Sequence, residues 1–527
     1  AAARDVAPRP KGSATESLVV QRSILEDLPE HTKSAFPQSI RNEDFEEIEH
    51  PGTEVQPNSD PVRLRVPKFW DPLEFKSKGG VRQYLGNYGE RLMTKEEALS
   101  IGSTVPALTE SAPPVFEAGT GESGGEGTPG RYIRKGQSGV VGTGEMLETI
   151  YVAIASYRDW QCPHTVESVF NRARHPERIR VAVVDQVDSS DSKCVDPLEP
   201  CENKPDQALC RYRDQIDTFE IDASLAVGPV FARHLGYRMY RGEYFATQAD
   251  AHVEFVRDWD EDIISQWKSA NNEMAVLTAY LSDIQGSIDE KTGKSLRNSR
   301  PIMCRTDFEG GGQMEHLRHG QQPEGEPGIK GTPTLEPYWA AGFSFGRGHF
   351  VLNIPYDQHL PMIFQGEEIS LGLRGFTYGY DFYTPERSIC FHMYATGKNK
   401  AKRQRVKLFW EHSNLWAGAE RKGMARLLGI IQMSPEIDSS WWLHDDEKKY
   451  GIGKVRTAQK FFDTFGIHLE SKTVEQHLCR FVGRKMQAQF IPHLRKNGMG
   501  INYDDIRFQF KDPAPNEKPP PLNGRGM

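Results

Sequence analysis

The chain contains 527 residues, carries a formal net charge of −8 and is 37% hydrophobic. Its length allows roughly two or three domains. Its acidic balance argues against a nucleic-acid-binding protein, because such proteins neutralise phosphates with an excess of Lys and Arg. The chain has no run of about 18 apolar residues, so no transmembrane helix is expected. The first residue is Ala rather than Met, which leaves open a targeting segment or anchor that has been removed.

Seven cysteines are too few to form a disulfide scaffold in a chain of this length. Four of them cluster between positions 162 and 210, but without the C-x2-C pairs of a zinc site. For Cys162, Cys194, Cys201 and Cys210, both disulfides and free thiols therefore stay open. The absence of an N-x-S/T sequon slightly favours the cytoplasm over the Golgi lumen.

The first 147 residues differ in composition from the rest of the chain. Residues 1–60 are polar, acidic and rich in Pro, Glu and Ser, which predicts disorder. Residues 61–118 carry apolar side chains, including Leu64 and Val66, and are expected to pack as an arm on the main domain. Residues 119–147 are rich in glycine and are interpreted as a linker.

Buried strands and helices alternate from residue 148 onward. The apolar run Thr149–Ser156 predicts a strand, Val166–Ala173 a helix and Arg178–Asp185 a second strand. A third strand is expected at Thr218–Ile221, followed by a helix that starts at Gly228-Pro229 and continues through Arg241. Because the strands are apolar throughout rather than alternating, they predict a parallel sheet covered on both faces, and hence an α/β fold.

The main domain is expected to cover residues 148–410, and residues 411–527 to form a helical extension and tail. The further elements predicted in these two parts are helices at Ile263–Ala270, Gln365–Phe376, Thr457–Phe465 and near Trp441 and Trp442, and strands at Met274–Tyr280, Tyr338–Phe345 and Arg387–Ala395.

Asp250 and His252 are the strongest candidates for a metal site. They follow the short strand Tyr244–Thr247 with one residue between them, so a continuing strand would direct both side chains to one face. Mn²⁺ accepts carboxylate and imidazole ligands, and Mg²⁺ accepts carboxylates. Open α/β sheets bind their ligands at the carboxyl ends of the strands. An isolated D-x-H is more often a turn cap beside a partly buried histidine, so the site needs support from other residues.

Asp258, Asp260 and Asp262 form a second acidic cluster close by. They are interpreted as the N-cap and first-turn acids of the helix Ile263–Ala270, because carboxylates stabilise the positive end of a helix.

Seven segments between residues 149 and 467 carry a resemblance to a known family. They are IYVAIASYRD, GPVFAR, YFATQADAHVEFVRDWDE, AAGFSF, GEEISLGLRGFTYGYDFYTP, CFHMY and YGIGKVRT. In this order and spacing they resemble glycosyltransferase family 60, the polypeptide α-N-acetylglucosaminyltransferases, which include a cytoplasmic enzyme that modifies hydroxyproline on an F-box ubiquitin-ligase adaptor. The resemblance implies a Rossmann-like GT-A fold with a mostly parallel sheet.

The same resemblance implies a retaining transfer of N-acetylglucosamine from UDP-N-acetylglucosamine to a hydroxyl of hydroxyproline, Thr or Ser in a polypeptide. It implies Mn²⁺ or Mg²⁺ as cofactor, bound by Asp250, His252 and, from the CFHMY segment, His392. A cation there would neutralise the leaving diphosphate. Arg233, one helical turn after Pro229, would reach the phosphates, or else form a surface salt bridge.

The other candidate site residues are expected to contact the substrates. Ser156, Tyr157 and Arg158 follow the first strand and would contact uridine and ribose. The aromatic strand that contains Trp339 and Gly342 would form a wall against the sugar.

Three acids, Glu367, Glu368 and Asp381, would hold the acceptor or the sugar hydroxyls. A basic run at positions 398–405 is either a solvated face or a loop that closes over the pyrophosphate.

The sequence is also compatible with two functions of other classes. Gly342 to Gly346 matches the G-x-S-x-G pattern of a serine hydrolase, with Ser344 as nucleophile and Asp381 and His392 in the required order. That pattern requires a following helix, whereas Arg347–Leu352 is predicted to continue as strand. The second alternative is a sugar-binding or scaffolding GT-A protein without catalysis, against which the three metal-ligand candidates argue.

Overall fold

The computed structural model describes residues 45–53, 60–67 and, with short gaps, 149–474, together with the segments 82–84, 90–92, 132–133, 146–147, 494 and 500–503. Within these residues, no helix combines the length and the apolar character needed to cross a bilayer.

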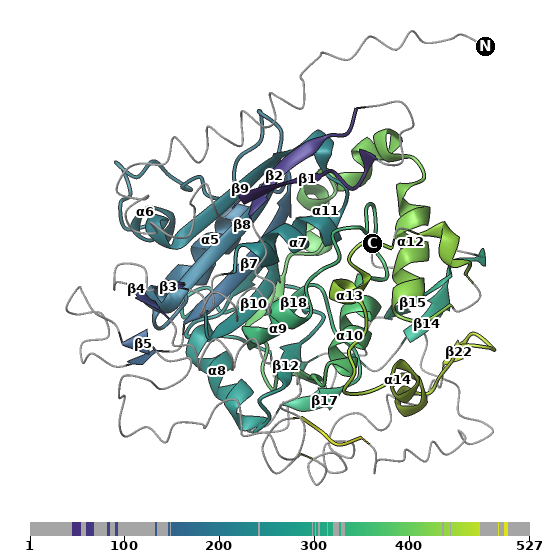
Figure 1. Cartoon of the computed structure of the whole chain (residues 1–527). Helices are drawn as coiled ribbons and strands as arrows, with labels where there is room; N and C mark the ends of the chain where they lie inside the picture. The colour runs from purple at the N-terminus through teal and green to yellow at the C-terminus, as the bar shows by residue number, and fades with distance from the viewer. Residues whose placement is uncertain are drawn as a thin grey trace.

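An eight-stranded sheet forms the centre of the molecule (Figure 1). Across the sheet the order is β17 (Thr334–Glu336), β19 (Asp381–Thr384), β12 (Ala275–Thr278), β18 (Phe343–Arg347), β10 (Phe245–Asp250), β7 (Ile150–Tyr157), β8 (Ile179–Val187) and β9 (Ile216–Asp222).

Parallel pairing joins β9, β8, β7 and β10, and it also joins β12 and β19. β18 runs antiparallel to both β10 and β12, and β17 antiparallel to β19. Because β18 opposes both of its neighbours, β12 and β19 point in the same direction as β10. The carboxyl ends of all strands except β17 and β18 therefore share one edge of the sheet. The predicted α/β fold with a largely parallel sheet is confirmed.

The apolar runs of the sequence form the central strands because both faces of the sheet are covered. Every residue from Ile150 to Ile154 in β7 is buried, as is every residue of β8 up to Gln186. Pro163 and Pro229 lie in the first turns of α5 and α7, where a missing backbone N–H costs no helical hydrogen bond.

Most of the predicted helices are present in the structure. The helices α10, α12, α13 and α14 lie together to one side of the sheet (Figure 1). The α-helices are α5 (Cys162–Asn171), α6 (Ala208–Arg211), α7 (Pro229–Arg238), α8 (Trp259–Ser269), α9 (His349–Asn353), α10 (Glu367–Thr377), α11 (Lys400–Arg403), α12 (Ala419–Ile430), α13 (Glu447–Tyr450) and α14 (Ala458–Phe465). The 3-10 helices are η5 (Pro176–Arg178), η6 (Arg213–Gln215), η7 (Ala223–Leu225), η9 (Gly397–Asn399), η10 (Phe409–Trp416) and η11 (Ser439–Trp441).

The remaining strands form small two-stranded sheets. These pair β1 (Phe45–Glu49) with β2 (Arg63–Pro67), β3 (Arg82–Tyr84) with β4 (Glu90–Leu92), β5 (Tyr132–Ile133) with β6 (Met146–Leu147), β11 (Val253–Phe255) with β20 (Cys390–His392), β13 (Ser299–Arg300) with β16 (Glu326–Pro327), β14 (Thr306–Glu309) with β15 (His316–His319), and β21 (Ile467–His468) with β22 (Thr473–Val474).

Three predicted elements differ from the structure. The strand expected from Tyr338 begins only at Phe343, and His349–Asn353 is helix α9 rather than strand. Near Trp441 the backbone forms the short 3-10 helix η11 instead of an α-helix, whereas α12 was not predicted.

The β1–β2 hairpin attaches the N-terminal part to the core. Leu64 and Val66 are buried in the main core, which agrees with the predicted packing of the arm at these positions. His50 is buried as well, and its Nε2 lies 2.7 Å from the carbonyl oxygen of Leu225. The predicted disorder of residues 1–60 is therefore wrong for residues 45–53. Most of the predicted arm and linker lies outside the described residues.

Deleting residues 1–60 is expected to lower the melting temperature, because it removes β1 and the buried His50. Without β1, the buried Leu64 and Val66 of β2 lose their paired strand, and exposing one such apolar side chain costs about 2 kcal/mol. For a domain of more than 300 residues this loss corresponds to roughly 3 °C. Deletion of residues 1–44 alone, a polar segment, serves as the control and should leave the melting temperature unchanged. Differential scanning fluorimetry distinguishes the two, and equal melting temperatures for both deletions would contradict the assigned role of the hairpin.

The described cysteines form two disulfides, Cys162–Cys194 and Cys201–Cys210, while Cys390 is a buried free thiol. Cys304 and Cys479 lie outside the described residues. The first disulfide joins α5 to the loop after β8, so it fixes a loop at the carboxyl edge of the sheet.

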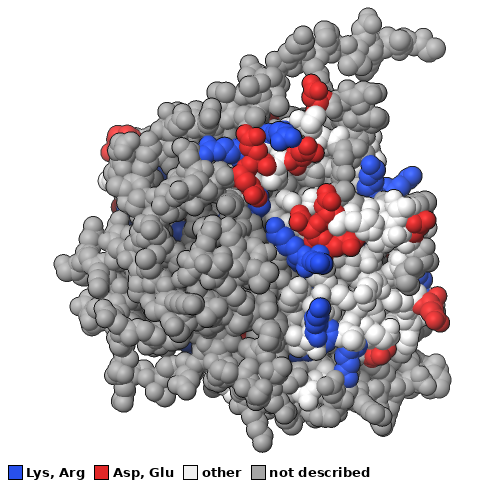
Figure 2. Space-filling model, in the orientation of Figure 1, with Lys and Arg blue, Asp and Glu red and all other residues white. Residues whose placement is uncertain are grey.

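The described surface on the face shown in Figure 2 mixes acidic and basic side chains rather than gathering one sign.

Candidate active site

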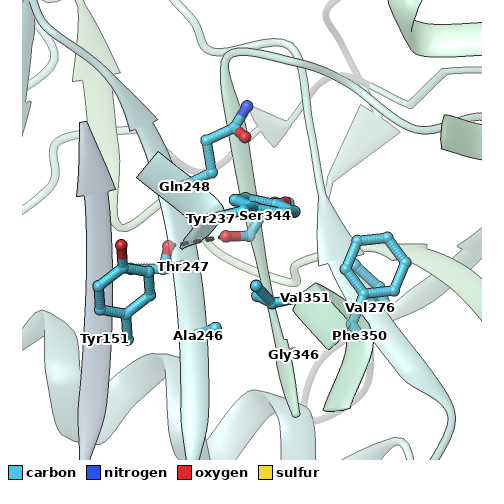
Figure 3. A pocket seen from close by; sticks show the side chains of 10 residues that line it. All are labelled: Tyr151, Tyr237, Ala246, Thr247, Gln248, Val276, Ser344, Gly346, Phe350 and Val351. Carbon is cyan, nitrogen blue, oxygen red and sulfur yellow. Dashed lines mark hydrogen bonds between the residues drawn. The ribbon is translucent and has the colours of Figure 1, made fainter. Parts of the chain in front are cut away.

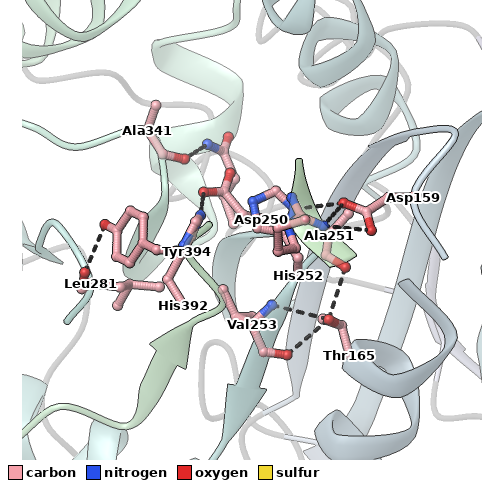
Figure 4. Close-up of polar contacts among 12 residues, drawn as sticks. Asp159, Thr165, Asp250, Ala251, His252, Val253, Leu281, Ala341, His392 and Tyr394 are labelled. Atoms are coloured by element: carbon pink, nitrogen blue, oxygen red, sulfur yellow. Dashed lines mark hydrogen bonds and ion pairs between the residues drawn. The ribbon is translucent and has the colours of Figure 1, made fainter. Parts of the chain in front are cut away.

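The D-x-H segment lies at the carboxyl edge of the sheet. Asp250 is the last residue of β10, and His252 follows in the turn before β11. β11 pairs with β20 so that Val253 lies opposite His392. Thr165 of α5 braces the turn, because its Oγ1 lies 2.9 Å from the carbonyl oxygen of Ala251 and accepts a hydrogen bond from Val253 N at 3.1 Å. The fold therefore brings two histidines, far apart in sequence, to one place (Figure 4).

Asp250, His252 and His392 form a group with metal-ligand geometry. One ligand atom from each lies within 4.8 Å of the others, and no second such group occurs among the described residues. His392 Nε2 is 3.6 Å from Asp250 Oδ2, and the two imidazole centroids are 4.4 Å apart. Burial, followed by the neighbouring His252, lowers the pKa of His392 well below its usual range. The imidazole is therefore neutral, which is the form that binds metals.

The surroundings of this group also fit a bound cation. The buried Nδ1 of His392 has no hydrogen-bond partner within the part of the chain that the structure describes. A side chain at Gly342 would place its Cβ 3.0 Å from Asp250 Oδ2, so glycine keeps that carboxylate oxygen accessible. An acidic oxygen and two neutral imidazoles are a donor set suited to Mn²⁺.

Arg233 connects the metal-ligand candidates to α10. It donates to Asp250 Oδ1 at 2.8 Å and also to Glu367 Oε1. Burial raises the pKa of Glu367, although Arg233 opposes this shift. Burial and the neighbouring Glu367 raise the pKa of Glu368 to about 7, and Tyr280 donates its hydroxyl to Glu368 Oε1 at 2.6 Å. Glu367 therefore shares Arg233 with Asp250, and Glu368 lies close enough to Glu367 for the two charges to interact.

The predicted nucleotide residues end β7 at the same edge. Ser156 is buried, and Tyr157 donates its hydroxyl to Glu411 Oε1 at 2.6 Å. Arg158 donates to Glu411 at 2.9 Å and to Asp191 at 2.7 Å, and it adopts a left-handed backbone with φ of 49°. These two acids fix the Tyr157 and Arg158 side chains beside the metal-ligand candidates.

Two predicted site residues lie elsewhere. Asp381 begins β19, so it is at the amino edge of the sheet, opposite the carboxyl edge that carries Asp250. Its carboxylate is buried and accepts from Asn272, Arg456 and the backbone of Ile501. Trp339 is fully buried, so it forms core rather than a wall against a sugar. The structure supports neither predicted role.

The acidic cluster after β11 is a helix start, as predicted, and not a metal site. Helix α8 begins at Trp259, with Asp258 as its N-cap residue and Asp260 and Asp262 in the first turn. Asp258 makes no side-chain cap bond. Asp260 is fully buried and forms an ion pair with Arg178 at 2.6 Å, a role that the sequence analysis did not predict.

Ser344 lies in the middle of β18 and is paired with Gln248 on one side and Thr278 on the other. The cavity beside it, lined in part by Tyr151 and Tyr237, has a volume of about 10 Å³ (Figure 3). A cavity of this size holds about one water molecule and no substrate. Although helix α9 does follow, a nucleophile elbow places its serine in a sharp turn, so the hydrolase alternative is excluded by the position of Ser344.

Two residues of the site were not predicted as site residues. Asp159 lies 2.8 Å from His252, and Glu411 holds Tyr157 and Arg158. The quoted segment IYVAIASYRD does contain Asp159, but nothing in the sequence pairs it with a histidine 93 positions later. Glu411 carries no local signal, because it lies in an irregular 3-10 helix.

The fold and the site together define an α/β domain with a candidate metal-ligand group at the carboxyl edge of a largely parallel sheet, the edge where such folds bind their ligands. The chain belongs to the family of GlcNAc glycosyltransferases, since the model described as Glycosyltransferase (GlcNAc) matches residues 149–201 and 195–471, more than half of the chain. The predicted GT-A type of α/β fold is confirmed.

Solved structures with similarity to the chain include two glycosyltransferases. One is the crystal structure of GalNAc-T7 with UDP, GalNAc and Mn²⁺, with 15% identity and a TM-score of 0.37, covering 60% of this chain and 56% of the other. The other is TarS 1–349 of S. aureus in complex with UDP, with 11% identity and a TM-score of 0.28, covering 55% of this chain and 72% of the other. The chain thus matches little more than half the length of GalNAc-T7. No curated protein sequence matches the chain significantly.

Proposed function

We propose that the protein is a metal-dependent retaining transferase that moves N-acetylglucosamine from UDP-N-acetylglucosamine to a polypeptide hydroxyl, on hydroxyproline, Thr or Ser. The observation that carries the proposal is the convergence of Asp250, His252 and His392 at the carboxyl edge of the sheet, in a chain of a GlcNAc glycosyltransferase family. The choice of acceptor follows from the resemblance of the seven sequence segments to glycosyltransferase family 60.

Asp250, His252 and His392 would hold Mn²⁺ or Mg²⁺, with Mn²⁺ favoured because two of the three ligands are imidazoles. When bound, the cation supplies positive charge for the leaving diphosphate. Arg233 holds Asp250 through Oδ1, so Oδ2 stays directed toward His392. The protein therefore orients its acidic ligand before the donor arrives.

The uridine and ribose would bind at Ser156, Tyr157 and Arg158. Because Glu411 and Asp191 already hold two of these side chains, their arrangement is preorganised and little side-chain entropy is lost on binding. The basic segment, defined here as residues 397–405, follows β20 closely and would lie beside the diphosphate.

The acids of α10 would serve the sugar and the acceptor. Glu367 is committed to Arg233, so we assign it a positioning role. Glu368, with a pKa of about 7, can bind or release a proton near neutral pH, and we assign it to a sugar or acceptor hydroxyl. Asp381 and Trp339 receive no role in the reaction, and Gly342 serves by leaving space beside Asp250.

Donor hydrolysis tests the proposal directly. The purified protein is expected to hydrolyse UDP-N-acetylglucosamine slowly without acceptor, to lose this activity in EDTA and to regain it with Mn²⁺, because the diphosphate cannot leave without charge neutralisation. UDP release is measured by chromatography, with UDP-galactose as the control donor. Full hydrolysis of UDP-N-acetylglucosamine in the presence of EDTA would contradict the metal-dependent mechanism.

The acceptor requires a separate experiment. Incubation with UDP-N-acetylglucosamine and cell extract, followed by mass spectrometry, should identify a glycosylated peptide and its modified residue. Glycosylation of lipid or free sugar with no modified peptide would contradict the polypeptide acceptor.

For the compartment, we infer an oxidising lumen rather than the cytoplasm that the missing sequon slightly favours. Two disulfides among the described cysteines support this inference, because such bonds are reduced in the cytosol.

A further inference from the structure

We propose that Asp159 is the positioning residue of His252, and that Arg403 of the basic segment fixes Asp159. The inference rests on the proposed metal centre and assigns roles to two residues outside the ligand group. It makes the metal affinity depend on the basic segment, which lies outside the ligand group.

The contact between Asp159 and His252 selects the ligand nitrogen. Asp159 Oδ2 lies 2.8 Å from His252 Nδ1, and the two residues face each other beside α5 (Figure 4). A carboxylate on one ring nitrogen holds the proton there, fixes the ring plane and leaves the other nitrogen, Nε2, with its lone pair. Asp159 thus prepares His252 as a ligand without touching the metal.

Asp159 is itself held from two directions. It is buried, and its Oδ1 accepts the backbone N–H of Gln161 at 2.9 Å at the start of α5. Arg403 Nη1 lies 2.9 Å from Oδ1 and 2.8 Å from Oδ2. A buried carboxylate needs such partners, because leaving it unpaired is strongly unfavourable. Removal of Arg403 should therefore disturb Asp159 and, through it, His252.

The basic segment is anchored where this contact occurs. Lys402 Nζ lies 3.4 Å from the ring centroid of Trp160, the residue after Asp159. At the other end, Gln285 Nε2 donates to the carbonyl oxygen of Thr396 at 3.0 Å. These contacts hold Arg403 in place and show that the predicted loop is at least partly a site element rather than a solvated face.

The test is Mn²⁺ affinity, measured by electron paramagnetic resonance titration of the full chain without donor. Asp159→Asn keeps an oxygen that accepts the hydrogen bond from Gln161 N, but it removes the negative charge that faces His252 Nδ1. This variant is expected to bind Mn²⁺ roughly 10–100-fold more weakly. Arg403→Ala is expected to weaken Mn²⁺ binding in the same direction by a smaller factor, and Arg403→Lys to restore part of the loss. Lys448→Ala is the control, since Lys448 is an exposed cation of α13 that belongs neither to the ligand group nor to the basic segment. The Mn²⁺ affinity of this variant should equal that of the native protein.

The outcomes separate this inference from the proposed function. If the native protein binds no Mn²⁺, the metal centre itself is wrong. If the native protein binds Mn²⁺ and both Asp159→Asn and Arg403→Ala bind it equally well, the positioning role is overturned. Circular dichroism verifies folding, and should Asp159→Asn fail to fold, Arg403→Ala decides the matter alone.

Discussion

Replacing His392 by alanine is expected to abolish Mn²⁺ binding and to slow donor turnover by about a hundredfold or more. Loss of a ligand removes charge stabilisation at the leaving diphosphate, which is worth several kcal/mol of barrier. Asp250→Asn should have a similar effect, because the amide removes the negative charge while it can still accept the hydrogen bond from Arg233. Turnover is followed as UDP release, and binding by the same titration of Mn²⁺.

Asp262→Ala is the matched control for these two variants. Asp262 belongs to the same acidic stretch, but its side chain is partly exposed and pairs with Arg387 at the surface. Surface ion pairs contribute about 0–1 kcal/mol to stability, so this variant should retain both turnover and Mn²⁺ affinity. Retained turnover in His392→Ala, with the fold intact, would show that the ligand group does not serve the reaction.

The ligand group illustrates how far the sequence alone can predict a site. Asp250 and His252 are adjacent to a strand end, so local alternation and the rule for α/β sheets identify them. His392 lies 140 positions after His252 and was reached only through the family resemblance. The contacts of Asp159 with His252 and with Arg403 depend on how the turn after β7 packs against α11 at the sheet edge, and no local pattern encodes that packing.

The assignment of Asp381 failed for a topological reason. A segment with acids and aromatic residues near a helix can end a strand or begin one, and the sequence pattern is the same in both cases. Only the pairing of β19 with β12 shows that Asp381 begins its strand at the amino edge. The prediction that Trp339 contacts a sugar failed for a related reason. Elements later in the chain cover this aromatic run, with α10 packing against Trp339 and α14 against Tyr338.

Replacing Asp260 by alanine is expected to cost stability rather than activity. The sequence suggests a first-turn acid whose loss costs about 1 kcal/mol. The structure predicts more, because Asp260 is fully buried and accepts the backbone N–H groups of Arg174 and His175 in addition to the ion pair with Arg178. Removing it leaves Arg178 buried without its partner, which typically costs about 3–5 kcal/mol.

A domain of more than 300 residues unfolds with an entropy of roughly 0.7 kcal/mol/K, so that loss lowers the melting temperature by roughly 4–7 °C. The melting temperature of Asp260→Asn should lie between those of Asp260→Ala and the native protein. The amide oxygen still accepts a backbone hydrogen bond, but Arg178 loses its negatively charged partner. Asp262→Ala removes a partly exposed carboxylate of the same helix turn and should change the melting temperature little. Below its melting temperature, Asp260→Ala should bind Mn²⁺ as the native protein does, because Asp260 in the first turn of α8 pairs with Arg178 and does not belong to the ligand group. An Asp260→Ala protein that keeps its stability and loses Mn²⁺ would instead place the metal in the acidic cluster of α8, against the assignment of Asp250, His252 and His392.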